Sequence, residues 1–292
     1  MDVSFDRLNL AEPFGRYCYA TLPAANDKKI HGGITKNCIY EQYFTTWRAN
    51  ELTPIDGAML SPLEGETPMC GRLSQYRGIH DFVAALSMPG ALINNVGDQP
   101  QGRYNAAPTM QLALFHAAEN NLRADAVRWG CRPHWATDCP APINARVEKV
   151  AHGPFFRQIW PHRAICPIDN WFEWVDEGGP KKQPYLIRHR DSSPILCASI
   201  GQLPGQDRSE HEGFVIITAD SEGGMVDIHD RRPVVLTPDL AREWLDPATP
   251  KERTEQMALH QGEPAEAFEW FKVDRAVGNV RNQGSDLTNP VD

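Results

Sequence analysis

From about residue 111 onward, the chain is a succession of short segments rich in Val, Ile, Leu and aromatic residues, separated by clusters of Pro, Gly and Asp. Such segments favour the half-buried surface of a strand, and such clusters favour turns. Strands are expected at 111–117, 126–130, 163–168, 171–175, 183–189, 194–201, 213–219 and 232–237. They outnumber the helices and do not alternate with them regularly. The sequence therefore predicts an α+β fold with a largely antiparallel, barrel-like β-sheet core and flanking helices.

Four helices are expected, at 79–88, 153–160, 237–245 and 249–260. The first has apolar residues near helical spacing. The third has Thr237 as N-cap and Pro238 in its first turn. The fourth has the pattern of a capping box, with Thr249 three residues before Glu252.

Residues 1–68 show no sustained helical or strand periodicity, and residues 51–68 have the composition of a linker. The stretch "NCIYEQY", residues 37–43, can be back-translated with permitted codons into the inverted repeats CTGT and ACAG. Such a palindrome is expected of an operator for the bacterial DNA-damage repressor. We predict that residues 1–68 are an N-terminal extension, either translated from a mis-assigned start or disordered, and that one catalytic domain spans 69–292.

The composition argues against several classes of protein. The N-terminal residues form neither a basic nor an apolar signal region, and no apolar run is long enough to cross a bilayer, so a cytoplasmic protein without membrane contact is expected. The seven cysteines include no C-x-x-C pair, so we expect reduced thiols, no metal and no cofactor. The net charge of −9 argues against a protein that coats nucleic acid, although it allows a local groove lined by arginine.

Four short segments are dense in functional groups: "MCGR" at 69–72, "INAR" at 143–146, "WFEW" at 171–174 and "DIHDR" at 227–231. Strand alternation places Glu173 on the face of Trp171, so its carboxylate is expected to be partly desolvated and suited to proton transfer. It could equally be a structural partner of an arginine. His229 is either an acid/base group or structural, and Asn144 either orients a substrate oxygen or closes a turn.

Together these segments resemble the SOS response-associated peptidase (SRAP) family, whose members act as abasic-site processing proteins. The resemblance runs from Met69 to about Val291. It also includes "RYNAAPT", "RWGCRPHWA", "FFRQIWPHRAICPIDNWFEW", "KKQPYLI", "VDIHDRRPVVL" and "RAVGNVRNQGSDL".

The resemblance implies specific roles. Cys70, exposed as the first residue by loss of Met69, would be the nucleophile, with Asn144, Glu173 and His229 around it. The residues implied to contact DNA are Arg72, Pro108, Trp135, Arg146 and Arg231, with Pro108 and Trp135 in a wedge between bases. Ala136 stands where some members have a second aromatic residue. The implied partner is single-stranded DNA containing abasic sites, bound by a monomer that associates with the nucleoid when it binds DNA.

A covalent reaction requires Cys70 to come first, because its nitrogen is otherwise an amide. Removal of Met69 after initiation there, or self-cleavage of the Met69–Cys70 bond, would expose it. Lyase-type strand scission is an expected side activity. Two other functions stay open: a thiol peptidase acting on other proteins, because Cys, His and Asn residues are present, and a non-covalent binder of damaged single strands.

Overall fold

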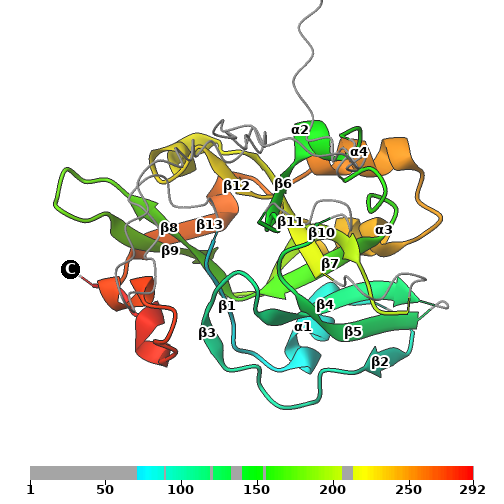
Figure 1. Ribbon diagram of the computed structural model, residues 1–292, viewed down its shortest axis with the longest axis horizontal. Helices are drawn as coiled ribbons and strands as arrows, with labels where there is room; N and C mark the ends of the chain where they lie inside the picture. The colour runs from blue at the N-terminus through cyan, green and yellow to red at the C-terminus, as the bar shows by residue number, and fades with distance from the viewer. Residues whose placement is uncertain are drawn as a thin grey trace, which may run out of the picture. The chain divides into compact units, whose positions relative to one another are not determined.

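The computed structural model describes residues 71–88, 90–118, 121–132, 140–153, 156–205 and 213–291 (Figure 1). Residues 1–70 lie outside this part of the chain, and so do Trp135 and Ala136. The predictions made for Cys70, for the wedge residue Trp135 and for the extension 1–68 therefore stay predictions.

One sheet has five strands in the order β13-β9-β8-β1-β3, all antiparallel. Its strands are β1 (Leu73–Gln75), β3 (Arg103–Ala106), β8 (Asn170–Val175), β9 (Gln183–His189) and β13 (Phe268–Lys272).

The other sheet follows the order β12-β11-β10-β7-β4-β5-β2, and β6 pairs with β11 beside this path. Its strands are β2 (Leu92–Asn94), β4 (Gln111–Ala118), β5 (Asn121–Arg128), β6 (Asn144–Arg146), β7 (Arg163–Ile168), β10 (Ile195–Gln202), β11 (Gly213–Asp220) and β12 (Arg231–Pro233). Among the described strand pairs of this sheet, β2–β5 and β6–β11 are parallel and the others are antiparallel, and an isolated parallel bridge also joins Trp129 to Phe214. The α+β class and the largely antiparallel pairing are confirmed, but the sheets do not close, so barrel-like is a loose description.

The α-helices are α1 (Ile79–Leu86), α2 (Val147–Val150), α3 (Pro238–Leu245) and α4 (Lys251–His260). Short 3-10 helices are η2 (Gly223–Asp227), η3 (Ala265–Ala267), η4 (Arg275–Gly278) and η5 (Ser285–Thr288). No helix in the described part of the chain has both the length and the apolar character needed to cross a membrane.

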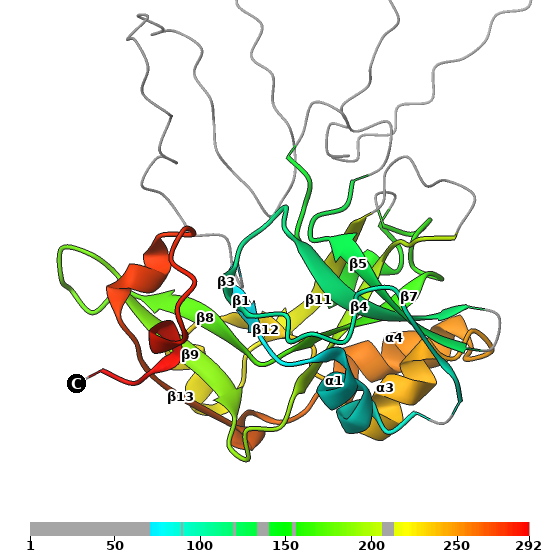
Figure 2. The ribbon, with the colours of Figure 1, turned by 90° about the horizontal axis from the view of Figure 1, so that it is seen from below.

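The buried residues form three apolar clusters, which define the layers. The first packs α1, α3 and α4 against one face of the eight-stranded sheet, with Phe82 and Trp244 fully buried (Figure 2). The second fills the space between the two sheets and includes Trp171 and Phe214. The third covers the outer face of the five-stranded sheet with residues of η4, η5 and their surroundings. β8 therefore lies between two apolar layers, which explains why both of its faces are buried.

Most expected strands are present, and three of the four expected helices are present as α1, α3 and α4. The helix predicted at 153–160 and the capping box predicted for α4 need correction. Residues 156–162 form successive turns rather than a helix, with single bonds such as the 3.0 Å bond from the Trp160 N–H to the Phe156 carbonyl. The capping box of α4 is absent because the Thr249 hydroxyl donates to the Glu243 carbonyl at 2.7 Å. The Thr237 cap of α3 is confirmed, since its Oγ1 accepts the Leu240 N–H at 3.5 Å.

Close backbone packing beside β11 leads to a stability prediction. A Cβ atom on Gly201 of β10 would lie 2.3 Å from the Gly213 carbonyl oxygen and 2.9 Å from the Phe214 Cα. Replacing Gly201 by Ala must push β11 away, so we expect the free energy of unfolding to fall by about 1–3 kcal/mol in urea denaturation. Gly179→Ala, where the nearest such atom is 3.8 Å away, is the control and should change it by less than about 0.5 kcal/mol. Equal effects of the two substitutions would contradict the tight approach.

Candidate functional site

The pairing of β1 with β8 fixes where the N-terminal end of the described chain lies. Leu73 pairs with Trp171 in antiparallel register. One residue before Leu73, the Arg72 carbonyl accepts the Phe172 N–H at 3.0 Å. In an antiparallel pair, each step back along one strand is matched by one step forward along the other. The pairing therefore continues on the N-terminal side of β1.

The same register sets Gly71 opposite Glu173. Gly71 is buried, and Glu173 is 3% exposed. Cys70 lies outside the described residues, but it is covalently joined to Gly71, and consecutive Cα atoms are about 3.8 Å apart. Gly71, the residue that follows the sequence-predicted nucleophile, therefore lies at the same end of the strand pair as the sequence-predicted base.

β8 alternates as the sequence predicts. Trp171 packs in the apolar cluster between the two sheets, whereas Phe172 packs in the cluster under the C-terminal turns, with Trp174 against it. Glu173 is two residues from Trp171, so it shares that face and points toward the space between the sheets. Because Glu173 is 3% exposed, its carboxylate is shielded from bulk water.

Asn144 enters this region from the other sheet. It begins β6, whose three residues run parallel to β11 with Asn144 opposite Ile216. The side chain is buried, with 4% of the residue exposed. The preceding residue, Ile143, packs in the cluster between the sheets together with Trp171.

His229 lies in the connection between η2 and β12, and its side chain is 24% exposed. Its neighbour Ile228 packs at the margin of the cluster between the sheets. Burial lowers the pKa of His229, and the positive charge of Lys182, which precedes β9, acts in the same direction. The influence of Lys182 places His229 near the β8–β9 hairpin.

The protonation state of His229 follows from its contacts. The Arg231 backbone N–H donates to Nδ1 at 3.0 Å, and the Asp230 Oδ1 lies 2.8 Å from the same nitrogen. One ring nitrogen cannot accept from the first and donate to the second at once. A backbone N–H can only donate, and Asp230 is 83% exposed to water, so we assign Nδ1 as the acceptor and place the ring proton on Nε2. The lowered pKa keeps this imidazole neutral near pH 7.

Two arginines flank the site in different ways. Arg72 donates from Nη1 to the Asn105 Oδ1 at 2.9 Å and to the Val277 carbonyl at 2.7 Å, and its guanidinium lies 5.8 Å from the centre of the Trp174 ring. Arg146 ends β6, and its buried Nε has no hydrogen-bond partner among the described residues. Arg146 therefore retains donor capacity directly beside Asn144, whereas Arg72 ties the start of β1 to the C-terminal turns.

A family model described as SOS response associated peptidase (SRAP) matches residues 69–280. The abasic site processing protein YedK of Escherichia coli is 44% identical over 224 residues, which cover 76% of this chain and 100% of that protein. The abasic site processing protein YoaM of Bacillus subtilis is 31% identical over 75% of this chain and 97% of its own length. The chain belongs to the SRAP family. A crystal structure of a phage-related protein from Bordetella bronchiseptica matches the SRAP domain with a TM-score of 0.59 and 36% identity, over 70% of this chain and 95% of that one.

The other cysteines of the SRAP domain that the structure describes are poor nucleophiles. Cys131, Cys166 and Cys197 are buried and carry free thiols. Burial raises the pKa of Cys131 to about 11 and raises the pKa values of Cys166 and Cys197 as well. Because the thiolate is the reactive form, these three side chains stay inert near neutral pH.

Arg231 of the SRAP domain has many partners of its own. Its guanidinium donates to both carboxylate oxygens of Glu148 at 2.6 and 3.0 Å, to the Thr218 carbonyl at 2.7 Å and to Asp220. The side chain is 7% exposed. A phosphate would have to compete with two carboxylates there, so DNA contact by Arg231 stays a prediction, while the structure shows it holding β12, β11 and α2 together.

Pro108 lies in the turn between β3 and β4, where it is half-buried. Thr109 has a φ of 75°, and its N–H donates to the Trp129 carbonyl at 2.9 Å. The turn is thus held firmly with Pro108 at its corner, but its proposed wedge partner, Trp135, lies outside the described residues. In the described part of the chain, no three His, Cys, Asp or Glu side chains lie close enough to hold a metal ion.

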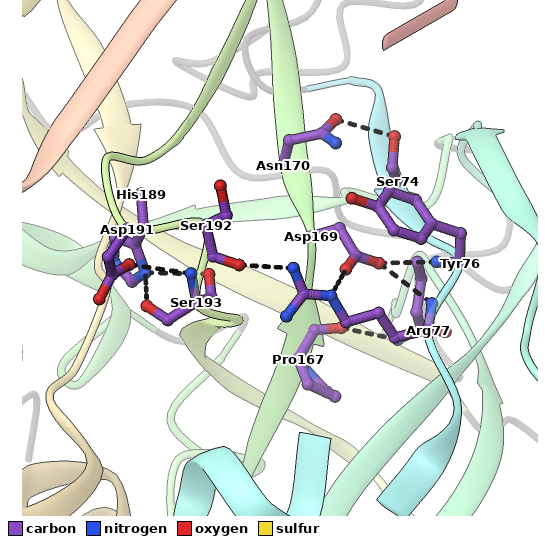
Figure 3. Close-up of polar contacts among 11 residues, drawn as sticks. Ser74, Tyr76, Arg77, Pro167, Asp169, Asn170, His189, Asp191, Ser192 and Ser193 are labelled. Carbon is purple, nitrogen blue, oxygen red and sulfur yellow. Dashed lines mark hydrogen bonds and ion pairs between the residues drawn. The ribbon is translucent and has the colours of Figure 1, made fainter. Parts of the chain in front are cut away.

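Sequence reasoning missed two residues of this region. Lys182 acts on His229 from a neighbouring hairpin, and Asp169 holds the far end of β1 (Figure 3). Lys182 follows another lysine in a polar turn, so nothing in its local pattern singled it out. Asp169 stands between the apolar segment 163–168 and "NWFEW". The only sign in the sequence that it has a structural role was this carboxylate between two segments expected to be strands.

The electrostatic arrangement around His229 makes a direct prediction. Replacing Lys182 by Met removes a positive charge that disfavours the imidazolium, so the pKa of His229 should rise. Replacing Asp230 by Asn removes a stabilising negative charge, so that pKa should fall. NMR titration of the His229 ring protons measures both shifts. Lys251→Met, which removes the partner of Glu255 on α4, should leave the titration unchanged.

Proposed function

We propose that this SRAP-family chain processes abasic sites in single-stranded DNA by forming a covalent thiazolidine crosslink through Cys70 at the N-terminus of its working form. The observation that carries the proposal is the β1–β8 register, which sets Gly71 opposite Glu173 and leaves Cys70 one residue further on. The names of the relatives YedK and YoaM, both called abasic site processing proteins, support the choice of substrate.

The chemistry uses two nucleophiles on one residue. The Cys70 α-amine attacks the aldehyde of the open abasic sugar and loses water to give an imine. The thiol then adds across the C=N bond: sulfur bonds to carbon, the proton goes to nitrogen, and a five-membered ring closes. Holding the thiol next to the imine makes the second step effectively unimolecular, which can lower the barrier by about 7–11 kcal/mol. An α-amine has a pKa of about 7.7–8.0, so a useful fraction is unprotonated near neutrality.

We assign a chemical role to each of the three polar residues Glu173, His229 and Asn144. Glu173 accepts a proton from the Cys70 ammonium and orients the amine. The imidazolium form of His229, a minor fraction near pH 7 because its pKa is lowered, donates the Nε2 proton to the sugar ring oxygen and returns to the neutral imidazole. The bond from the anomeric carbon to the ring oxygen breaks, the anomeric hydroxyl loses its proton to water, and the aldehyde forms. Asn144 hydrogen-bonds the Cys70 backbone or a hydroxyl of the open sugar. Loss of a proton from the carbon beside the imine gives β-elimination, so lyase-type strand scission is the expected side reaction.

DNA binding is assigned to Arg72 and Arg146, with Pro108 and Trp135 separating the bases. A phosphate contact by Arg231 would have to displace Glu148 or Asp220 from its guanidinium. Phosphate contacts carry no base information, so sequence preference is expected to be slight and the affinity should fall with salt. The chain acts as a monomer in this proposal.

The proposal requires a chain that begins at Cys70, because an amide nitrogen cannot form the imine. Protein beginning at Cys70, mixed with an abasic single-stranded oligonucleotide, should give a band that survives denaturation. Protein that retains Met69, and Cys70→Ala in the processed form, should give none. Glu173→Gln should slow band formation by about 10²–10⁴-fold while changing affinity for undamaged single strands little.

The outcomes separate the alternatives. A stable non-covalent complex with no band indicates a binder of damaged strands. Hydrolysis of unrelated peptides by protein that retains Met69, lost in Cys70→Ser, indicates a thiol peptidase. Equal loss of binding and crosslinking in Glu173→Gln makes Glu173 an architectural residue and overturns its role as base.

The unpartnered Nε of Arg146 predicts a phosphate contact. Arg146→Ala should weaken binding to every single-stranded sequence alike, and the slope of log affinity against log salt should become less steep by about one unit. Fluorescence anisotropy across a salt series measures both quantities. Arg253→Ala, which removes a surface charge paired with Glu243 at 2.6 Å, is the control and should leave the slope unchanged. If the two variants behave alike, Arg146 does not contact phosphate.

A further inference from the structure

Asp169 joins β7 to β8, and its carboxylate is completely buried. Its Oδ2 accepts the Tyr76 N–H at 2.7 Å and the Arg77 N–H at 3.3 Å, from the two residues that follow β1. The Arg77 Nε lies 2.7 Å from Oδ1, and the Asp169 N–H donates to the Ser74 carbonyl at 2.8 Å. Figure 3 shows this carboxylate facing the end of β1, with the Arg77 side chain folded over it toward Ser192. One side chain therefore fastens the trailing end of β1 to the start of β8.

The leading end of β1 is held by Arg72, whose guanidinium donates to Asn105 and to the carbonyls of Val277 and Gly278. Those partners lie outside β8, so they do not by themselves fix how β1 pairs with β8. The β1–β8 ladder is itself short, with register pairs at Leu73 and Ser74. A slip of one residue would turn every side chain of the strand to the opposite face. Asp169 bonds to β1 and its trailing residues from the start of β8 itself, so it is placed to fix the register that sets Gly71 opposite Glu173.

We propose that Asp169 is a positioning residue for the crosslinking reaction, because its ionised carboxylate fixes the register of β1 on β8 and thereby sets the Cys70 amine against Glu173. This inference rests on the proposed function. Asp169 touches neither Gly71 nor Glu173 in the strand register, so it acts through the strand and not on the substrate.

The ionised form of Asp169 is disfavoured in the folded protein. Burial raises its pKa from 3.8 to about 6, and Asp81 on α1 acts in the same direction, whereas the Tyr76 N–H and Arg77 act in the opposite one. Arg77 and Tyr76 from the end of β1 and Asp81 from α1 are the charged and titratable groups that act on it, and Tyr104 of β3 stacks on Tyr76 at 4.7 Å.

The sign of the effect on stability follows from this raised pKa. The folded state binds the proton of Asp169 more tightly than the unfolded chain does. The stability contributed by protonation is fully present below the unfolded pKa near 3.8 and is lost as the pH rises through about 6. At pH 7.5 the carboxylate therefore lowers global stability while it supplies an acceptor for two backbone N–H groups and a counter-ion for Arg77. Such a cost at one buried group is typical of functional sites.

The Asp169→Asn variant distinguishes an effect on the position of β1 from an effect on folding stability. The Asn amide has the shape and the neutral charge of the protonated carboxyl group. At pH 7.5 the variant should crosslink abasic single strands at least about tenfold more slowly than the wild type, since small misplacements of reacting groups are costly. Its midpoint of thermal unfolding should be no lower, and its affinity for undamaged strands unchanged. At pH 5, where wild-type Asp169 is protonated, the two crosslinking rates should agree within about twofold.

Two further variants complete the experiment. Asp81→Asn is the matched control, because it removes an exposed charge near Asp169 without touching β1. Its crosslinking rate at pH 7.5 should equal that of the wild type, and the pH at which crosslinking slows should move downward, because Asp81 raises the pKa of Asp169. Arg77→Gln keeps the carboxylate but removes its counter-ion, so the pH at which crosslinking slows should move upward. This second variant tests the inference even if Asp169→Asn does not fold.

The outcomes distinguish this inference from the proposed function. Wild-type protein that forms no crosslink overturns the proposed function and this inference with it. Wild-type crosslinking together with an equally fast Asp169→Asn variant at pH 7.5 overturns the positioning role alone. A slow variant whose deficit is the same at pH 5 and pH 7.5 also overturns it, because the lost quantity is then not the ionised carboxylate.

Discussion

The antiparallel pairing of β1 with β8 is the constraint on which the rest of this structure depends. It places the first described residue of the domain, Gly71, against a buried carboxylate in the middle of the five-stranded sheet. Strand β1 is inserted between β8 and β3, and Arg72 is bonded to the C-terminal turns. The start of β1 is therefore one of the more constrained positions of the fold.

The arginines show how an acidic protein accommodates positive charge inside. Arg163 donates to the carbonyls of Trp244 and Asp246, Arg232 to that of Glu263, and Arg72 to that of Val277. Each of them closes the end of a helix or turn whose carbonyls lack a partner in regular structure. Arginine in an apolar segment was therefore an ambiguous indicator of phosphate binding in the sequence, and structural use explains many of these residues.

The long strands were predictable because their apolar alternation is local. The segments 163–168 and 183–189 match β7 and β9 at both ends. β6 and β1, with three residues each, were not predicted, because a strand of that length has no measurable period and exists only through its partners. β6 carries Asn144, and β1 begins two residues after Gly71. Glu173 and His229 were identifiable as residue types, but their placement depends on pairings between separate segments, and the roles proposed for them came from family resemblance.

Asp169 and Thr249 both show that a local sequence rule does not determine which groups a short polar side chain bonds to. Thr249 fits a local capping rule, yet its hydroxyl donates to the Glu243 carbonyl because the preceding helix ends within reach. Asp169 fits no local rule, yet its carboxylate gathers the two N–H groups that follow β1. In both cases an unsatisfied backbone group in a distant segment decides where a short polar side chain bonds, since buried N–H and carbonyl groups must find partners. The positions of such groups are set by the completed fold, so the polar residues that organise a site can be assigned only after the strands that surround them are known.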